Sequence, residues 1–281
     1  MRGESGETAL QSNQLTQHLT LTPWALVEPE SVLEADEGVR RELFGETKLG
    51  LLYSGNLGRA HIYRPFVELA RRVAGDSIAF CYAGRGPRMD ALREELPEEM
   101  RVASGEWREN ELQSPSLPCV QGRGEARVRG EFGEGFLQSK PLQPNQLTCN
   151  EGLRIRFAGF ASEEELGKRL GAADVHMVSL APNWTGAVVP SKFFGALAVG
   201  RPVLFAGSRK SAIVRWIEEF NVGWVLDDDA SVDRVAVQLR EFAADPSRVK
   251  AMREHCFEVY RREFSKAVQM EKWKSMLKAK G

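Results

Sequence analysis

From about residue 47 onward, short apolar runs alternate with segments whose apolar residues recur at helical spacing. Runs such as Leu49–Tyr53 and Val175–Leu180 are short and bounded by turn residues, which predicts buried strands. Between them, segments such as Ile62–Val73 place their apolar residues on one helical face. The pattern predicts six strands that alternate with helices. An alternation of this kind favours an α/β fold, with a parallel sheet that helices cover on both faces.

Composition divides the chain into a tail, a domain and an insertion. We interpret residues 1–46 as an N-terminal tail and connector, because the first 22 are polar and rich in Gln and Thr. Residues 47–281 carry the alternation and are expected to form one domain. Residues 97–151 interrupt it, and they are rich in Gly, Pro, Ser, Gln and Glu. So long a loop is unusual inside a compact domain, which predicts a low-complexity surface insertion, with a partner-docking segment as the alternative.

Charge and cysteine usage exclude several classes of protein. The 281 residues carry a net charge of −1, whereas nucleic-acid-binding proteins show a basic excess, so no nucleic-acid partner is expected. The four cysteines form no CxxC pair, which argues against a zinc site or disulfides and favours a cytoplasmic location. No secretory signal is recognised, and no apolar run reaches the roughly 20 residues of a membrane-spanning helix. We interpret Asp227–Asp229 as a helix cap rather than a metal site, and His176 as a core residue.

The loop after the first predicted strand is a candidate phosphate-binding loop. Gly55 and Gly58 let the backbone approach a ligand closely, and the Arg59 guanidinium can bind two phosphate oxygens at once. Asn56 and His61 lie in the same loop, and His61 is the histidine that we expect at a site. The alternative is an ordinary turn between a strand and a helix.

A second candidate anion site lies where a small-residue loop around Gly186 enters a helix at Pro190, Ser191 and Lys192. Proline suits the first helical turn, where free backbone N–H groups, a hydroxyl and an ammonium can together bind a phosphate. A cation there opposes the helix dipole unless an anion accompanies it, which favours this reading over a solvated lysine. Both candidate loops follow a strand, and parallel sheets bind ligands outside the carboxyl ends of their strands.

The loop Ala83–Arg88 is a weaker candidate. Its Gly84-x-Gly86 lacks the third glycine of a dinucleotide-binding fingerprint, so we interpret it as a turn that leads into a helix. The chain has no Gly-Lys-Ser or Gly-Lys-Thr sequence, which argues against a P-loop NTPase.

Taken together, these pieces resemble the donor-nucleotide-binding, C-terminal half of GT-B glycosyltransferases, over about residues 47–96 and 152–280. The likeness is greatest to the large retaining group, group 1 or family 4, that builds bacterial surface polysaccharides. The pieces occur in the family's order, and they are Tyr53–His61, Tyr82–Arg88, Arg156–Phe160, Ala172–Val175 and Val189–Val203.

The resemblance implies a Rossmann-like domain that binds a nucleotide diphosphate-sugar, a UDP- or GDP-sugar, at the carboxyl edge of its sheet. Arg59 and the glycine-loop amides would hold the diphosphate from one side, and Ser191 and Lys192 from the other. The loop that ends at Phe160 would lie near the base. Arg59 and Lys192 would be catalytic, because they stabilise the charge that develops on the leaving diphosphate. With those cations, neither a metal nor another cofactor is expected.

Two departures from the family pattern limit what the resemblance implies. No glutamate stands in Asn183–Gly186 or at Ser191–Lys192, where many relatives carry one. About 46 residues precede the first strand, too few for the family's acceptor-binding domain. We therefore expect a glycosyltransferase whose polysaccharide or glycolipid acceptor is bound by a separate chain, with peripheral membrane association open. The alternatives are a non-catalytic nucleotide-sugar-binding subunit, a degenerate fragment or, less favoured, an epimerase of similar fold.

Overall fold

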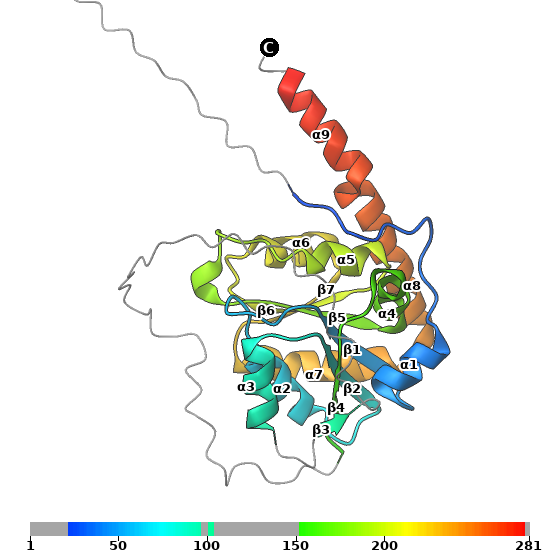
Figure 1. The fold of residues 1–281 in the computed structure, drawn as a ribbon, viewed down its shortest axis with the longest axis vertical. Coiled ribbons are helices and arrows are strands. Elements are labelled where there is room, and N and C mark those ends of the chain that lie inside the picture. Colours follow the sequence, from blue (N-terminus) through cyan, green and yellow to red (C-terminus); the bar gives the residue numbers. More distant parts are fainter. Residues whose placement is uncertain (1–21, 97–100, 104–151, 279–281) are drawn as a thin grey trace, which may run out of the picture.

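A computed structural model describes residues 22–96, 101–103 and 152–278. These residues form one parallel sheet of seven strands in the order β3-β4-β2-β1-β5-β6-β7 (Figure 1). The strands are β1 (Leu49–Ser54), β2 (Ile78–Ala83), β3 (Arg101–Ala103), β4 (Ile155–Ala158), β5 (Val175–Leu180), β6 (Val203–Gly207) and β7 (Gly223–Leu226). The predicted α/β, Rossmann-like parallel sheet is confirmed.

Strand β3 is not predicted from the sequence. Its three residues lie within the range 97–151, expected to be an insertion, yet they pair in parallel with β4 at the edge of the sheet. A three-residue edge strand is too short to show an apolar pattern. The remainder of that range, 97–100 and 104–151, lies outside the described residues.

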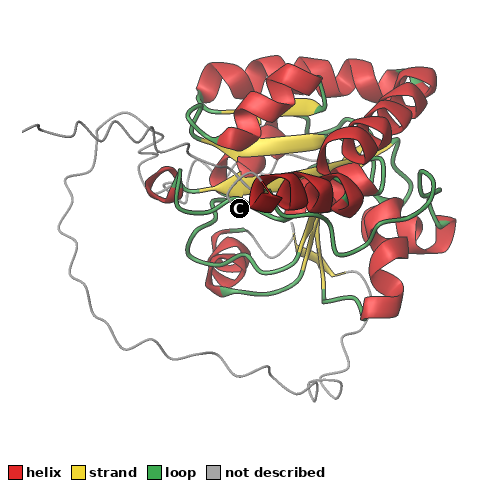
Figure 2. Ribbon diagram, turned by 90° about the horizontal axis from the view of Figure 1, so that it is seen from above, coloured by secondary structure: helices red, strands yellow, loops and turns green. Residues whose placement is uncertain are grey.

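Helices cover both faces of the sheet (Figures 1 and 2). Alternate residues of β1 point to opposite faces, so Leu51 packs in one apolar cluster and Leu52 in another. On the Leu51 face lie α2 (Arg64–Arg72), α3 (Pro87–Glu95) and α7 (Asp229–Ala244). The opposite face carries α1 (Glu37–Phe44), α4 (Glu163–Ala172), α5 (Lys192–Ala198), α6 (Ala212–Phe220) and α8 (Pro246–Val259).

Helix α1 packs on the sheet although it precedes the expected start of the domain at residue 47. The sequence predicts a tail and connector over residues 1–46, of which 1–21 lie outside the described residues. In the described part, Leu43 and Phe44 are fully buried against Leu52 and Cys81 of the sheet. The helix carries few apolar residues, so its periodicity is weak, but it belongs to the domain and its structure depends on this packing.

Polar residues cap two of the helices, and the cap at Asp228 was predicted from the sequence. The Asp228 carboxylate accepts a hydrogen bond from the Ser231 amide at 2.7 Å, so the expected capping role for the Asp227–Asp229 run is confirmed. Ser162 caps α4 in the same way, with its hydroxyl accepting from the Glu165 amide at 3.2 Å.

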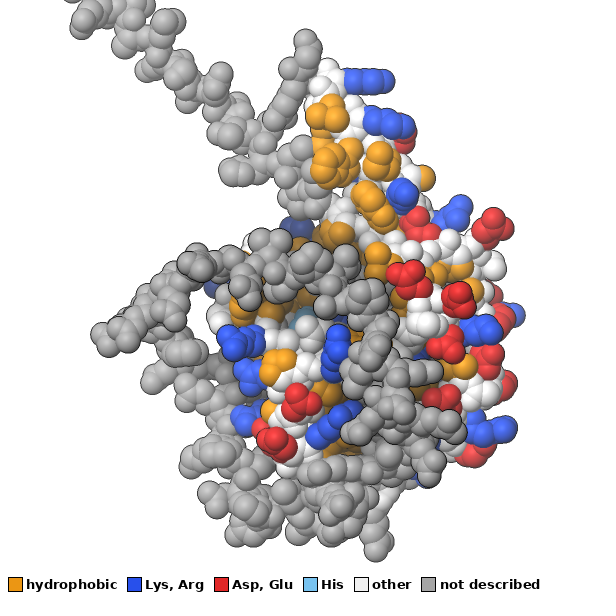
Figure 3. Space-filling model, viewed as in Figure 1, with side chains coloured by type: hydrophobic (Ala, Val, Ile, Leu, Met, Phe, Trp, Pro, Cys, Tyr) orange, Lys and Arg blue, Asp and Glu red, His pale blue; other side chains and the backbone are white. Residues whose placement is uncertain are grey.

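The C-terminal helix, α9 (Lys266–Lys278), projects from the body of the domain (Figure 1). Met270, Trp273 and Leu277 expose 39%, 41% and 70% of their surface along it. Figure 3 shows hydrophobic side chains along this projecting helix, with Lys or Arg side chains beside them. Within the described ranges, no helix combines the length and the apolar content that crossing a bilayer would require.

His176 is a core residue, as predicted. It lies in β5 with 3% of its surface exposed, and its Nε2 is 3.0 Å from the Leu170 carbonyl oxygen. Burial lowers the pKa of His176 from 6.5 to about 4.

This lowered pKa predicts acid sensitivity. Above pH 6.5 the imidazole is neutral in both the folded and unfolded states, so His176 makes no pH-dependent contribution there. As the pH falls from 6.5 to about 4, only the unfolded state binds the proton, and we expect a loss of about 3 kcal/mol of unfolding free energy. Urea unfolding measured between pH 6.5 and about pH 4 tests this predicted loss of stability. In the variant His176→Gln, the unfolding free energy should decrease less as the pH falls. An equal decrease in the variant and in the wild-type protein would contradict the assignment of this effect to His176.

Candidate functional site

The strand order reverses between β1 and β5. β1 pairs with β2 on one side and with β5 on the other, so chain connections leave this point in opposite directions. Parallel sheets bind ligands in the crevice at the carboxyl ends of such strands. The loop 54–61 follows β1, and the loop 181–191 follows β5, so both candidate loops start at this point of reversal.

The loop after β1 rests on the loop after β2 through backbone contacts. The Gly55 amide donates to the Ala83 carbonyl at 2.8 Å, and the Leu57 amide donates to the Arg85 carbonyl at 2.9 Å. Gly84 has φ +141°, and a Cβ built on it would lie 2.2 Å from the Gly55 carbonyl oxygen. The expectation that Ala83–Arg88 turns into a helix is confirmed, and Gly84 also supports the neighbouring candidate loop.

Lys192 reaches from the start of α5 to the loop after β1. Its Nζ donates to the Asn56 carbonyl at 3.4 Å and lies 5.2 Å from the centre of the Tyr53 ring. The Tyr53 hydroxyl donates to the same Asn56 carbonyl at 3.0 Å. Gly55 leaves room for the lysine, since a Cβ there would lie 3.2 Å from Lys192 Cε. Burial lowers the pKa of Lys192, and this makes an anionic partner more favourable.

His61 lies beside this lysine. Its Nδ1 donates to the Ser179 carbonyl at 2.7 Å, which ties the end of the candidate loop to β5. Burial lowers the pKa of His61, and the nearby Lys192 charge lowers it further, so the ring is neutral at pH 7. A neutral ring that donates from Nδ1 leaves Nε2 as an acceptor.

Arg59 is exposed and makes no ion pair within the part of the chain that the structure describes. Arg59 lies three residues after Asn56, in the loop that Lys192 contacts. Phe160 lies farther along the same sheet edge, after β4, and is 52% exposed. The Arg85 guanidinium lies 5.2 Å from the centre of its ring, a cation–π contact.

The helix start at Pro190–Lys192 differs in register from the prediction. The seven-residue helix α5 begins at Lys192 with Ser191 as its N-cap, so the buried Pro190 precedes the helix instead of occupying its first turn. The exposed Ser191 side chain makes no capping hydrogen bond, which leaves its hydroxyl available to a ligand. Gly186 adopts φ +86° in the loop that leads to it.

Sequence reasoning missed Tyr53 and Arg85 as site residues. Tyr53 lies in an apolar strand, a pattern that predicts a core residue. In the structure, its hydroxyl donates to the Asn56 carbonyl and its ring lies against the Lys192 ammonium. Arg85 stands between Gly84 and Gly86, and a cation in a glycine loop is the signal that could have marked it. In the described ranges, no group of three or more His, Cys, Asp or Glu side chains could hold a metal ion.

No protein-family model and no curated protein matches this sequence. Solved structures do match its fold. The C-terminal domain of the glycosyl transferase group 1 protein LpcC from Francisella tularensis superposes with a TM-score of 0.51 at 14% identity, over 84% of this chain and 97% of that domain. The chain has the fold of the C-terminal half of a GT-B glycosyltransferase.

Two longer solved structures of GT-B glycosyltransferases also match the fold of this chain. WaaG, a glycosyltransferase involved in lipopolysaccharide biosynthesis, has a TM-score of 0.51 at 14% identity over 89% of this chain. Anabaena HepE, solved in complex with UDP, has a TM-score of 0.53 at 11% identity over 88% of this chain. The chain spans 54% of the length of each. The predicted resemblance to one half of the GT-B fold is therefore confirmed.

Proposed function

We propose that this chain binds a nucleoside diphosphate-sugar, a UDP- or GDP-sugar, and supplies the donor half of a glycosyltransferase. One observation carries the proposal: the Lys192 ammonium lies 3.4 Å from the Asn56 carbonyl, across 136 residues of sequence. That contact brings a half-buried cation to a glycine loop at the point where the strand order reverses. Structures of the same fold that contain UDP, such as HepE, support the choice of ligand.

The chemistry of this site fits the departure of a diphosphate. In glycosyl transfer, the bond between the anomeric carbon and the β-phosphate oxygen breaks, and the diphosphate leaves with the electron pair. An acceptor hydroxyl oxygen forms the new bond to that carbon, and its proton passes to the departing diphosphate. Lys192 and Arg59 are cations available to stabilise the leaving charge, and Ser191 and the Gly55–Gly58 amides add hydrogen-bond donors. The resemblance to the retaining group favours transfer with retention.

We propose that another domain binds the acceptor, on a separate chain or on a longer form of this one. The chain spans only 54% of the matched WaaG and HepE chains, which supports this division. Polysaccharide or glycolipid acceptors, a cytoplasmic location and peripheral membrane association are proposed from the sequence resemblance. The exposed apolar side chains of the lysine-rich helix α9 are compatible with a membrane surface.

Removing either proposed cation should weaken nucleotide binding. Each lost charged hydrogen bond costs about 1.5–3 kcal/mol, so Arg59→Ala and Lys192→Ala should each bind UDP or GDP about tenfold to a hundredfold more weakly than wild type. Calorimetric titration measures this. Lys250→Ala on α8 removes an exposed lysine elsewhere and serves as the control. Wild-type affinity for UDP and GDP in both Arg59→Ala and Lys192→Ala would contradict the assignment of these residues to the nucleotide site.

A further inference from the structure

Tyr53 lies at the end of β1, directly before the loop that we propose to bind the diphosphate, and its side chain is fully buried. Neighbouring rings contact it on two sides. The Tyr82 ring stacks on it with the ring centres 6.0 Å apart and an interplanar angle of 29°, and the His61 ring meets it edge-on at 6.0 Å and 78°. Its hydroxyl donates to the Asn56 carbonyl at 3.0 Å. These contacts fix the Tyr53 ring beside the proposed site.

The Lys192 ammonium lies over this fixed ring. Its Nζ is 5.2 Å from the ring centre, a cation–π contact, and it donates to the Asn56 carbonyl at 3.4 Å. The Tyr53 side chain therefore contacts both the ammonium and the carbonyl that accepts from it. An ammonium has three N–H donors, and a bond to Asn56 leaves two of them for a phosphate. The ring attracts the charge through its π face, which leaves those donors available.

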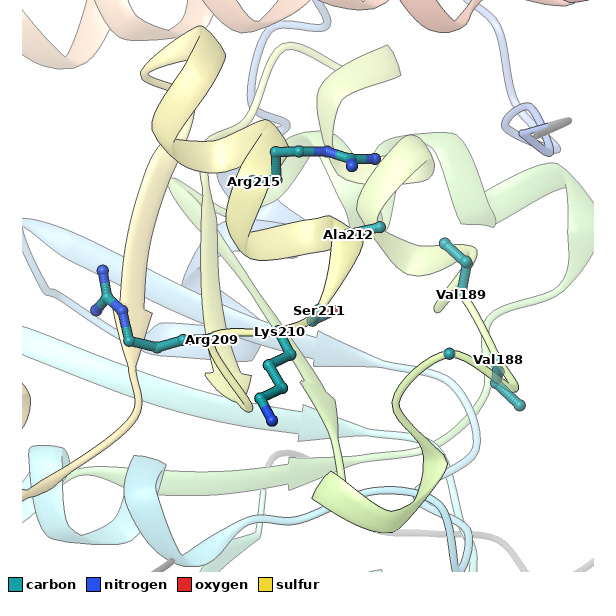
Figure 4. Close-up of a pocket in the computed structure, with 8 residues that line it drawn as sticks. Val188, Val189, Arg209, Lys210, Ser211, Ala212 and Arg215 are labelled. Carbon is teal, nitrogen blue, oxygen red and sulfur yellow. The ribbon is translucent and has the colours of Figure 1, made fainter. Parts of the chain in front are cut away.

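Two other ways of fixing this lysine contribute little. Val188 and Val189, in the segment that leads to α5, each expose 39% of their surface. They line a cavity of about 340 Å³ between this segment and the start of α6 (Figure 4), so the segment is only partly packed. Within the described residues, no carboxylate forms an ion pair with Lys192. The contacts with Tyr53 and Asn56 are therefore what orders this flexible side chain before a ligand binds.

We propose that Tyr53 is a positioning residue, whose ring holds the Lys192 ammonium where it meets the diphosphate. This inference depends on the proposed function, because it assumes that the diphosphate binds at Lys192. A lysine that is already in place loses little side-chain freedom when the anion binds, so a larger fraction of the protein is competent to bind. The ring acts through Lys192, and it contributes nothing to nucleotide affinity when that lysine is absent.

A double-mutant cycle, measured by calorimetric titration of the full chain with UDP and GDP, tests this inference. Tyr53→Leu removes the ring and should weaken binding about threefold to thirtyfold, the range that a cation–π contact supplies. In the Lys192→Ala background, the same replacement should change the affinity by less than about twofold, because the group that the ring positions is absent. An equal loss in both backgrounds would show that Tyr53 supports the loop and not the lysine, and it would overturn the inference.

Fluorinated phenylalanines at position 53 test the charge of the ring face with little change in shape, and they answer the question even if Tyr53→Leu does not fold. Tyr53→Phe keeps the ring and should bind within about threefold of wild type. Each added fluorine withdraws electrons from the ring and weakens its attraction for a cation. We therefore expect the affinity to fall stepwise, by about tenfold in total from phenylalanine to trifluorophenylalanine. Equal affinities across this series would contradict the inference.

The matched control places the same phenylalanines at position 82. Tyr82 is buried beside Tyr53 on the same face of the sheet, and within the described residues its hydroxyl has no hydrogen-bond partner. The Lys192 ammonium lies over the Tyr53 ring, so fluorination at position 82 should leave nucleotide affinity unchanged. A stepwise loss at position 82 equal to that at position 53 would mean that the effect is not specific to the ring under Lys192.

The remaining outcomes separate this inference from the proposed function. If UDP or GDP binds and Lys192→Ala weakens that binding, but the position 53 variants bind like wild type, the inference is overturned and the proposed function stands. Tighter binding by Tyr53→Leu would also overturn it, because the ring would then hold the lysine away from the diphosphate. If neither UDP nor GDP binds to the wild-type chain, both the inference and the proposed function fail.

Discussion

Replacing Arg201 with leucine is expected to lower the free energy of unfolding by about 3–5 kcal/mol. The Arg201 side chain is fully buried, and it donates to five backbone carbonyls. These carbonyls belong to the N-terminal segment, the end of α4 and the turn before β6, and they are those of Leu33, Gly171, Ala173, Val199 and Gly200. Leucine fills part of the space but leaves buried acceptors without donors.

Urea unfolding monitored by circular dichroism measures the Arg201 effect. Arg234→Leu on α7 is the matched control, because it exchanges an exposed arginine for the same residue, and its change should stay within about 0.5 kcal/mol. Arg201→Lys should be intermediate, since one ammonium cannot reach carbonyls on both sides of a guanidinium. A loss below about 1 kcal/mol in Arg201→Leu would show that water or a rearranged backbone replaces these hydrogen bonds.

Replacing Gly84 with alanine is expected to abolish most nucleotide binding while the protein still folds. The new Cβ would lie 2.2 Å from the Gly55 carbonyl oxygen, so the loop that contains Gly55 and Asn56 must move. Moving this loop removes its contacts to the nucleotide, and the loss of one charged hydrogen bond corresponds to a loss of about tenfold to a hundredfold in affinity for UDP or GDP. The positive φ and the clash should together cost about 2–4 kcal/mol of unfolding free energy.

The variant Gly75→Ala distinguishes the effect of backbone strain at a positive φ from the effect of displacing the loop after β1. Gly75 has φ +84°, but a Cβ there meets nothing within 4 Å, and the residue lies at the opposite end of β2. It should cost about 1 kcal/mol of stability and leave nucleotide affinity unchanged. Calorimetry and thermal unfolding on the two variants test the prediction together. Wild-type affinity in Gly84→Ala would mean that the loop after β1 does not hold the nucleotide.

Much of the fold could be read from local patterns. The six predicted strands, the cap at Asp228 and the core position of His176 depend on residues close together in sequence, and each was found where expected. Strand β3 was not, because three residues are too few to show a period, and helix α1 was not, because it carries few apolar residues. Their structure depends on partners elsewhere, β4 for the strand and the sheet face around Leu52 for the helix.

The amino-acid sequence alone determined that this chain forms a parallel α/β sheet and that glycine loops follow its strands, since periodicity and turn chemistry are local. The tertiary structure decided which groups meet. It brought Lys192 to Asn56 and Tyr53, and it placed Arg201 at the junction of three segments. Such contacts join residues more than a hundred positions apart. Their geometry is set by the order of strands in the sheet, which no short stretch of sequence encodes.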